Sequence, residues 1–344
     1  MSVILLIIIL AVLVLSHEFG HFIVAKLSGI KVLEFGLGLP PRAYGKKIGE
    51  TIYSLNWIPF GGYVRIHGED SDSTSPDLEP ERSISRKPRL VQAAVIVAGI
   101  VFNILLASVL IWVGLQAGLP VSVADFADHE SDITNHRVIV TAVVPGSPAD
   151  EAQIPPGTEI SNFETPEALQ DYVSAHKGEN VEVVTPDKTY ILLPEPILGI
   201  EMDFVGDAHL SPIQALPSAV SVTYRLTTGT AGALATFIGD ALKGEGSLEG
   251  VVGPVGIAGI VGEASKHGFI SLLLLTAILS LSLAVINLVP FPALDGGRLL
   301  FVIIEAIKGS PIKQKIANTI NVVGFSLLII LMLVITYRDI AKLV

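Results

Sequence analysis

The sequence contains no cysteine, which excludes disulfide bonds and thiolate ligands, so any bound metal must be held by histidine, aspartate or glutamate. Charged residues are scarce, at 16% of the 344 residues, and half of the residues are hydrophobic. The formal net charge of -11 argues against nucleic-acid binding. With a mean hydropathy of +0.63, the composition predicts an integral membrane protein with some soluble mass, whose partners include the lipid bilayer and no nucleic acid.

Long apolar runs predict about four transmembrane helices. These predicted spans cover residues 1–27, 90–116, 269–289 and 320–338. The first lacks the basic n-region and the cleavage site of a signal peptide, so we expect it to be retained. Ten of the 22 basic residues lie between Lys26 and Arg89, which places residues 28–89 in the cytoplasm by the positive-inside rule. The N-terminus and residues 120–212 are then expected outside.

The first span carries the motif His17-Glu18-Phe19-Gly20-His21 towards its end. Residues four apart share one helix face, so His17 and His21 would present two imidazoles to one metal ion. Zinc there would supply Lewis acidity and a water of lowered pKa, with Glu18 as the candidate general base. The alternative is a chance pair of solvated histidines. The apolar surroundings favour a metal site, because ionisable groups at membrane depth are costly.

A further ligand must come from elsewhere in the chain. The third span ends in NLVPFPALDGG, residues 287–297, where two prolines prevent the helix from continuing and the backbone must unwind. Asp295 lies on this segment, on the side of the two histidines by the predicted topology, and its oxygen suits zinc. Asn287 could bind a substrate backbone or a developing oxyanion. The alternatives are a helix N-cap for Asp295 and a structural amide for Asn287.

Residues 28–89 are rich in glycine and then acidic. The stretch 51–66 combines partial alternation with β-branched and aromatic residues, which predicts short strands or a hairpin that dips into the membrane cavity. A free edge there could accept an extended peptide by strand addition, and an ordinary surface hairpin is the alternative. The acidic stretch 69–81 has little that could form a core, so we expect a mobile loop.

Residues 120–212 have the composition of a soluble domain. Strands are expected at 138–144, 181–185 and 190–193, with a helix at 167–176, and the stretch 154–160 is expected to turn back into a further strand. The turns around Gly146-Ser147-Pro148-Ala149 and Pro156-Gly157-Thr158 resemble those of a bacterial PDZ domain, although the usual Asn-Gly turn is missing. Residues 213–268 predict an amphipathic membrane-surface segment with a turn at 250–256. Residues 290–319 are expected to form a cytoplasmic connection.

Taken in order, these features resemble the site-2 protease family (peptidase family M50) of intramembrane zinc metalloproteases, of the bacterial regulator of sigma-E protease (RseP) type. The resemblance implies that His17, His21 and Asp295 bind zinc, that Glu18 is the catalytic base and that Asn287 contacts substrate. It also implies a place in the bacterial inner membrane, with the active site near the cytoplasmic side. Its implied substrates are single-span membrane proteins already trimmed outside, such as anti-sigma factors, filtered by the PDZ-like domain.

The predicted fold is therefore a polytopic α-helical membrane protein with about four transmembrane helices, a membrane-associated β-hairpin region and one inserted extracytoplasmic PDZ-like α+β domain. The predicted function is hydrolysis of peptide bonds within or near the transmembrane segment of single-span proteins. One alternative is a catalytically silent PDZ-containing membrane adaptor, which would have no need of Glu18. The other is a metal transporter, for which more intramembrane polar residues and internally repeated halves would be expected.

Overall fold

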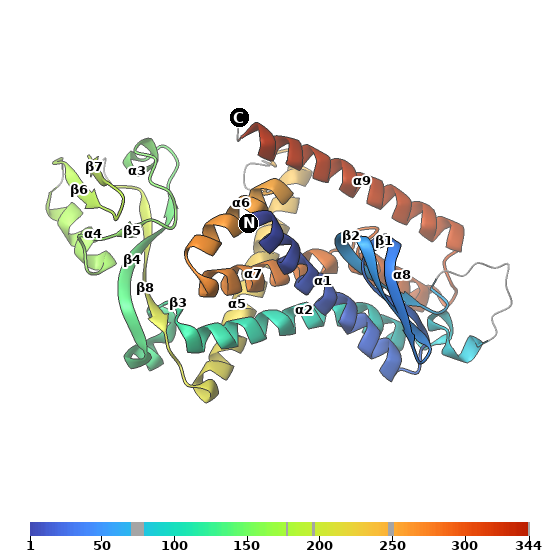
Figure 1. The fold of residues 1–344 in the computed structure, drawn as a ribbon. Coiled ribbons are helices and arrows are strands. Elements are labelled where there is room, and N and C mark those ends of the chain that lie inside the picture. The colour runs from blue at the N-terminus through green and yellow to red at the C-terminus, as the bar shows by residue number, and fades with distance from the viewer. Residues whose placement is uncertain (70–78, 177, 195–196, 247–250, 343–344) are drawn as a thin grey trace. The chain divides into compact units, whose positions relative to one another are not determined.

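The computed structural model describes residues 1–69, 79–176, 178–194, 197–246 and 251–342 (Figure 1). Most of the expected mobile loop at 69–81 lies outside these residues. The chain divides into two compact units. The helical unit comprises Met1–Ile111 and Ala219–Val344, and the inserted unit comprises Trp112–Ser218.

Four of the described helices are long and apolar enough to cross a membrane: α1 (Ser2–Leu27), α2 (Arg89–Ala117), α7 (Phe269–Leu288) and α9 (Gln314–Ala341). They support the prediction of an integral membrane protein. Between 28% and 44% of the apolar window is buried in α1, α2 and α7, but only 6% in α9. Nearly the whole apolar surface of α9 therefore needs a hydrocarbon environment.

The chain unwinds between α7 and α8 (Asp295–Lys308), over the proline-containing segment 289–294. The two glycines after Asp295 lie in the first turn of α8 and permit its close approach to the segment before it. A Cβ atom on Gly296 would lie 2.2 Å from the Val289 carbonyl oxygen, and one on Gly297 would lie 2.3 Å from that of Phe291. No side chain fits at either position, so the Asp295-Gly296-Gly297 sequence lets α8 begin directly against the unwound segment.

Helix α9 packs against other parts of the helical unit. Near its start, a Cβ atom on Gly324 would lie 2.3 Å from Pro292 Cβ, so the helix packs directly on the unwound segment. Near its end, Asp339 accepts hydrogen bonds from the backbone N–H groups of Gly253 (3.4 Å) and Gly256 (2.8 Å). Asp339 thus caps the N-terminus of α6 (Pro254–Lys266), where a carboxylate also complements the helix dipole. Part of the turn expected at 250–256 is therefore helix.

Strands β1 (Val32–Ile48) and β2 (Thr51–Ile66) form an antiparallel sheet and are longer than the short strands expected. Both strands bend, so that residues 34–37 of β1 pair with 52–55 on one side and with 62–65 on the other. The last five residues of β2, Gly62–Ile66, lie at an edge of this sheet and are called the edge segment. It pairs with β1 along one side, and no strand among the described residues pairs with its other side.

The inserted unit contains a four-stranded sheet in the order β3-β8-β4-β5 and a separate hairpin of β6 and β7. Its elements are β3 (Leu119–Ser122), η3 (Ala124–Asp132), β4 (Ile133–Val143), α3 (Pro148–Glu151), β5 (Glu159–Ile160), α4 (Pro166–Ala175), β6 (Val181–Val184), β7 (Thr189–Leu192) and β8 (Ile200–Ala208). Helix α5 (Pro212–Lys243) begins in this unit and continues in the helical unit. The α+β composition agrees with the prediction, but β3 and β8 were not predicted.

Candidate active site

Two histidines of α1 and the first residue of α8 meet inside the helical unit. The distance from Asp295 Oδ2 is 2.9 Å to His17 Nε2 and 3.2 Å to His21 Nε2. The two Nε2 atoms lie 3.1 Å apart. All three residues are buried, each with 8% of its surface exposed. The three residues predicted as metal ligands are thus brought together although Asp295 follows His21 by 274 residues and His17 by 278.

The neighbours of the imidazoles indicate which ring nitrogens carry protons. His21 Nδ1 lies 2.8 Å from the Val95 carbonyl oxygen, which can only accept a hydrogen bond. His21 must therefore donate from Nδ1, and in the neutral ring this leaves a lone pair on Nε2. The neighbour of His17 Nδ1 is Asn103, a fully buried residue of α2 whose side-chain nitrogen lies 3.4 Å away.

The amide of Asn103 fits better when its oxygen and nitrogen are exchanged. Asn103 Oδ1 is buried and has no hydrogen-bond partner among the described residues. Rotating the amide by half a turn lets this oxygen accept a hydrogen bond from His17 Nδ1–H. The oxygen and nitrogen of a side-chain amide are assigned by such hydrogen-bond fit. Both histidines then present lone pairs at Nε2, as metal-binding histidines with an anchored Nδ1–H do.

Three electron-pair donors about 3 Å apart repel one another unless a cation lies between them. Asp295 Oδ2 is buried and forms no described hydrogen bond, although both Nε2 atoms lie close to it. Tetrahedral zinc with bonds of about 2.0–2.2 Å holds its ligand atoms roughly 3.3–3.5 Å apart. The observed 2.9–3.2 Å is near this spacing, and the donor set of two imidazoles and one carboxylate suits zinc.

These ligands lie in a small pocket of about 210 Å³, the catalytic pocket. Its walls are formed by His17, Glu18, His21, Tyr63, Val64, Ile66, Glu69, Val95, Ile96, Asp295 and Arg298. Glu18 therefore faces the same space as the ligands, as predicted for a general base. Three residues of the edge segment also line it, which places a strand with an unpaired side next to the ligands.

Comparisons with known proteins agree with this arrangement. Residues 5–331 match peptidase family M50. The chain belongs to this family. A Clostridium perfringens protein provisionally named as a zinc metalloprotease is 36% identical over 344 residues, covering 95% of each chain. The regulator of sigma-W protease RasP of Bacillus subtilis is 27% identical, and the alignment covers 99% of each chain.

Zinc metalloprotease RasP of Geobacillus kaustophilus is also 27% identical, with 99% of this chain and 98% of the relative covered. The family and these names identify the chain as a zinc metalloprotease, which agrees with the function expected from its motifs. The match spans nearly the whole chain, including both the α1 motif and the Asp295 segment.

Asn287 is not brought into the catalytic pocket of this M50 peptidase by any described contact. It is half-buried in the last turn of α7 and is not among the described residues that line the catalytic pocket. Its predicted contact with substrate stays a prediction. Asn103 was not predicted as a functional residue, although a polar side chain in the middle of an otherwise apolar span gave a signal for it.

A close fit between α1 and α2 sets the position of the imidazoles. A Cβ atom on Gly20 of α1 would lie 2.4 Å from the Ala98 carbonyl oxygen of α2. A Cβ atom on Gly99 would lie 2.5 Å from His21 Nε2 and 2.7 Å from His17 Cε1. The glycines thus let the backbone of α2 cover one side of the M50 ligand set, and any larger residue at position 99 would displace both rings.

Tyr63 of the edge segment is held in place by a buried carboxylate. Glu34 of β1 is only 2% exposed and accepts hydrogen bonds from Tyr63 Oη (2.8 Å) and Arg42 Nη2 (2.6 Å). Burial raises the pKa of the Glu34 carboxyl, but the nearby hydroxyls of Ser54 and Tyr63 and the Arg42 guanidinium lower it by more, so the pKa lies below its ordinary value. The Tyr63 ring also packs on Gly36, where a Cβ would lie 2.7 Å from the ring.

Proposed function

We propose that this M50 peptidase hydrolyses peptide bonds within or near the transmembrane segment of single-span membrane proteins. The observation that carries the proposal is the buried convergence of His17, His21 and Asp295, within 3.2 Å of one another, between helices of membrane-spanning length. These three residues would hold zinc, which when bound supplies Lewis acidity and lowers the pKa of water. Glu18, in the same pocket, would accept the proton of the attacking water and pass it to the leaving amine.

The edge segment would hold the substrate. A helix in lipid hides its peptide groups in its own hydrogen bonds, so a substrate must unwind before its carbonyl carbon can be attacked. An extended chain can pair with the unpartnered side of Gly62–Ile66 and so satisfy its backbone groups. Val64 and Tyr63 line the catalytic pocket, so pairing at this point would bring a peptide bond beside the ligands.

We infer that Asn287 contacts the unwound substrate close to the reacting bond, as predicted from the motif. It belongs to the last turn before the chain unwinds towards Asp295, which supports this role. The substrates would include membrane-bound anti-sigma factors already trimmed outside, consistent with the name of the B. subtilis relative as regulator of sigma-W protease. The protein would lie in the bacterial inner membrane, with the catalytic pocket near the cytoplasmic side and the inserted unit outside.

The inserted unit would act as a PDZ-like domain that binds or filters chain ends. A cavity of about 480 Å³ lies between α4 and the start of β8. Its walls include Leu169 and Val173 of α4, and Leu198, Gly199 and Ile200 around the beginning of β8. An apolar groove between a helix and a strand of this kind fits an extended peptide terminus with an apolar last residue.

The proposed function is tested by cleavage of a tagged single-span protein in liposomes. The wild type is compared with Glu18→Gln and with Glu179→Gln, an exposed glutamate of the inserted unit that serves as the control. Zinc content is measured in all three. We expect the wild type and the control to cleave, Glu18→Gln to be inactive, and each protein to hold about one zinc. Cleavage by Glu18→Gln would contradict the role of the base, and absence of zinc from the wild type would contradict the site.

A further inference from the structure

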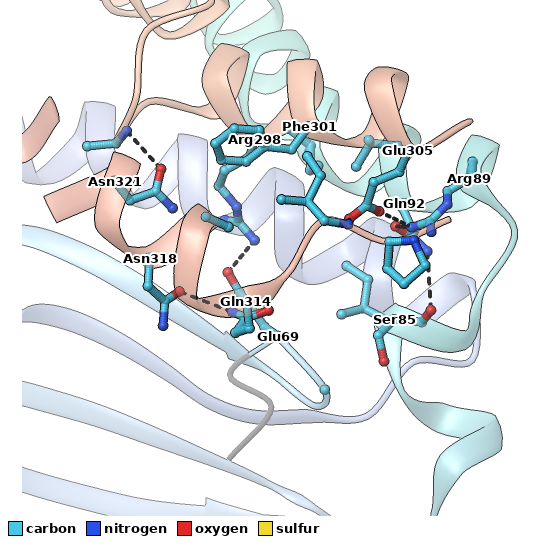
Figure 2. Close-up of a pocket in the computed structure, with 18 residues that line it drawn as sticks. Glu69, Ser85, Arg89, Gln92, Arg298, Phe301, Glu305, Gln314, Asn318 and Asn321 are labelled. Carbon is cyan, nitrogen blue, oxygen red and sulfur yellow. Dashed lines mark hydrogen bonds and ion pairs between the residues drawn. The ribbon is translucent and has the colours of Figure 1, made fainter. Parts of the chain in front are cut away.

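A second, larger cavity of about 550 Å³ adjoins the catalytic pocket (Figure 2). The two share Glu69, Ile96 and Arg298 in their walls. Arg298, on the first turn of α8, forms an ion pair with Glu69, as Figure 2 shows. Both residues line both spaces, so this pair lies where the two spaces meet. A chain that leaves the catalytic pocket on this side must therefore pass the ion pair into the larger cavity.

The lining of the larger cavity combines polar and apolar side chains, and its charges are matched. Its second ion pair joins Arg89 of α2 to Glu305 of α8 at 2.6 Å, so the charges in the wall are matched. One side is formed by Gln314, Asn318 and Asn321, which share one face of α9 because they lie four and three residues apart. This polar face stands out at the start of a helix that is otherwise apolar.

Such a lining matches the chemistry of a peptide backbone. Amide side chains both donate and accept hydrogen bonds, as peptide groups do. Gln314 Nε2 donates to Asn318 Oδ1 at 3.1 Å, which leaves the other polar atoms of these two side chains without a described partner. Neither an anion nor a cation would find an unmatched charge here, and the volume lies within the roughly 300–1,000 Å³ that ligand pockets occupy.

The course of β2 gives the direction in which a substrate would run. The edge segment lines the catalytic pocket at Tyr63, Val64 and Ile66, and the chain continues to Gly68 and Glu69, which line the larger cavity. A peptide paired with the edge segment is therefore guided from one space to the other. Residues 64–66 run extended, but the chain then turns, with Glu69 N–H donating to the Ile66 carbonyl oxygen at 3.4 Å, so a substrate that continues straight reaches the ion pair within a few residues of the scissile bond.

We propose that the larger cavity is a substrate subsite for an extended stretch of polypeptide that begins a few residues from the scissile bond. Gln314, Asn318 and Asn321 bind its backbone, and the substrate parts Arg298 from Glu69 as it enters. This inference rests on the proposed function, because it needs a peptide substrate that is unwound at the catalytic pocket.

The absence of cysteine from the chain makes a direct test possible. Asn318→Cys is introduced into the Glu18→Gln protein, which is expected to bind substrate without cleaving it. Single-span substrates, each with one cysteine within ten residues of the cleavage position on either side, are then oxidised with it. The control is Thr319→Cys, the next residue of α9, which is exposed and does not line the cavity.

We expect Asn318→Cys to form a disulfide only with substrate cysteines on one side of the scissile bond, and Thr319→Cys to form none above background. Gln314→Cys, one turn away, should give the same pattern if Asn318→Cys folds poorly. Adducts that are equal at positions 318 and 319, or cavity cysteines that react with a small thiol reagent but not with substrate, would overturn the subsite. Failure of the wild type to cleave the parent substrate would instead overturn the proposed function.

Discussion

At the scale of single residues, the candidate metal centre depends on groups outside the set of candidate ligands. Val95 and Asn103 of α2 fix the imidazoles through their Nδ1 atoms, and Gly99 leaves room for the rings. All three belong to one helix, so α2 acts as the support on which the α1 motif is oriented. A motif of two histidines on α1 would otherwise leave both rings free to rotate about their side-chain bonds.

The clearest residue-scale prediction concerns Asn103. Asn103→Leu removes the hydrogen-bond acceptor for His17 Nδ1–H while keeping a side chain of similar size, so we expect zinc affinity to fall by about 10–100-fold. Asn103→Asp, which retains an acceptor oxygen, should bind zinc more tightly than Asn103→Leu. Zinc occupancy in detergent, measured over a series of buffered free-zinc concentrations, distinguishes them. Equal affinity in the wild type and Asn103→Leu would mean that the amide does not orient His17.

That His17, His21 and Asp295 belong together could be predicted from the sequence because their signals are local. Two histidines four apart in an apolar run, and an aspartate after two prolines, each stand out against their surroundings. Asn103, Arg298 and Glu69 could not be assigned in this way. Their roles depend on which helices and strands come together, and nothing in the residues around them specifies that.

At the scale of elements, the bend in β1 and β2 decides which strand faces the ligands. The sequence indicated extended structure in this region, but not that residues 34–37 would lie between two segments of β2 and leave Gly62–Ile66 at the edge. Strand β8 was missed altogether, although Ile200, Met202 and Phe204 alternate with polar residues. The length of a strand and its neighbours are set by pairing with distant segments, which local patterns do not record.

Glu34 gives an element-scale prediction, because it ties β1 to the edge segment through Tyr63. Its pKa is lowered on folding, so its ionised form stabilises the folded state above the ordinary glutamate pKa of about 4.3, and this stability is lost as the pH falls through the lower folded value. We expect the thermal unfolding midpoint of the wild type to exceed that of Glu34→Gln at neutral pH, and the gap to shrink below about pH 4.3.

Glu201→Gln is the matched control, since Glu201 is an exposed residue of β8. Its unfolding midpoint is expected to follow that of the wild type throughout the pH series. A gap between the wild type and Glu34→Gln that stays constant from neutral to acidic pH would show that the network does not depend on the charge of Glu34.

At the scale of the whole molecule, the two ends of the inserted unit lie side by side within that unit. Leu119 at the start of β3 is paired with Ala208 at the end of β8, and Leu210 N–H donates to the Leu115 carbonyl oxygen at 2.8 Å. The unit has its own hydrophobic core, which includes Val138, Leu169 and Val181. None of the ligands, and none of the residues that line the catalytic pocket, lies within it.

We therefore predict that residues 119–208 can be replaced by a short glycine-serine linker without loss of the metal centre. Paired strand residues have Cα atoms roughly 5 Å apart, which a few residues can bridge. The shortened protein should still hold about one zinc and should still cleave a short model substrate. Zinc content and cleavage are measured beside the full-length protein. Loss of zinc from a soluble, monodisperse preparation would show that the inserted unit supports the ligands.

The pairing of Leu119 with Ala208 also bears on how such a chain can change over generations. A gene that gains, lengthens or loses the coding stretch between these two positions alters the length of the protein in a single event. The two ends still meet, so α2 and α5 on either side keep their order in the chain whatever the length of the insertion. The inserted unit can thus vary in length while the helical unit, which carries His17, His21 and Asp295, keeps its own sequence.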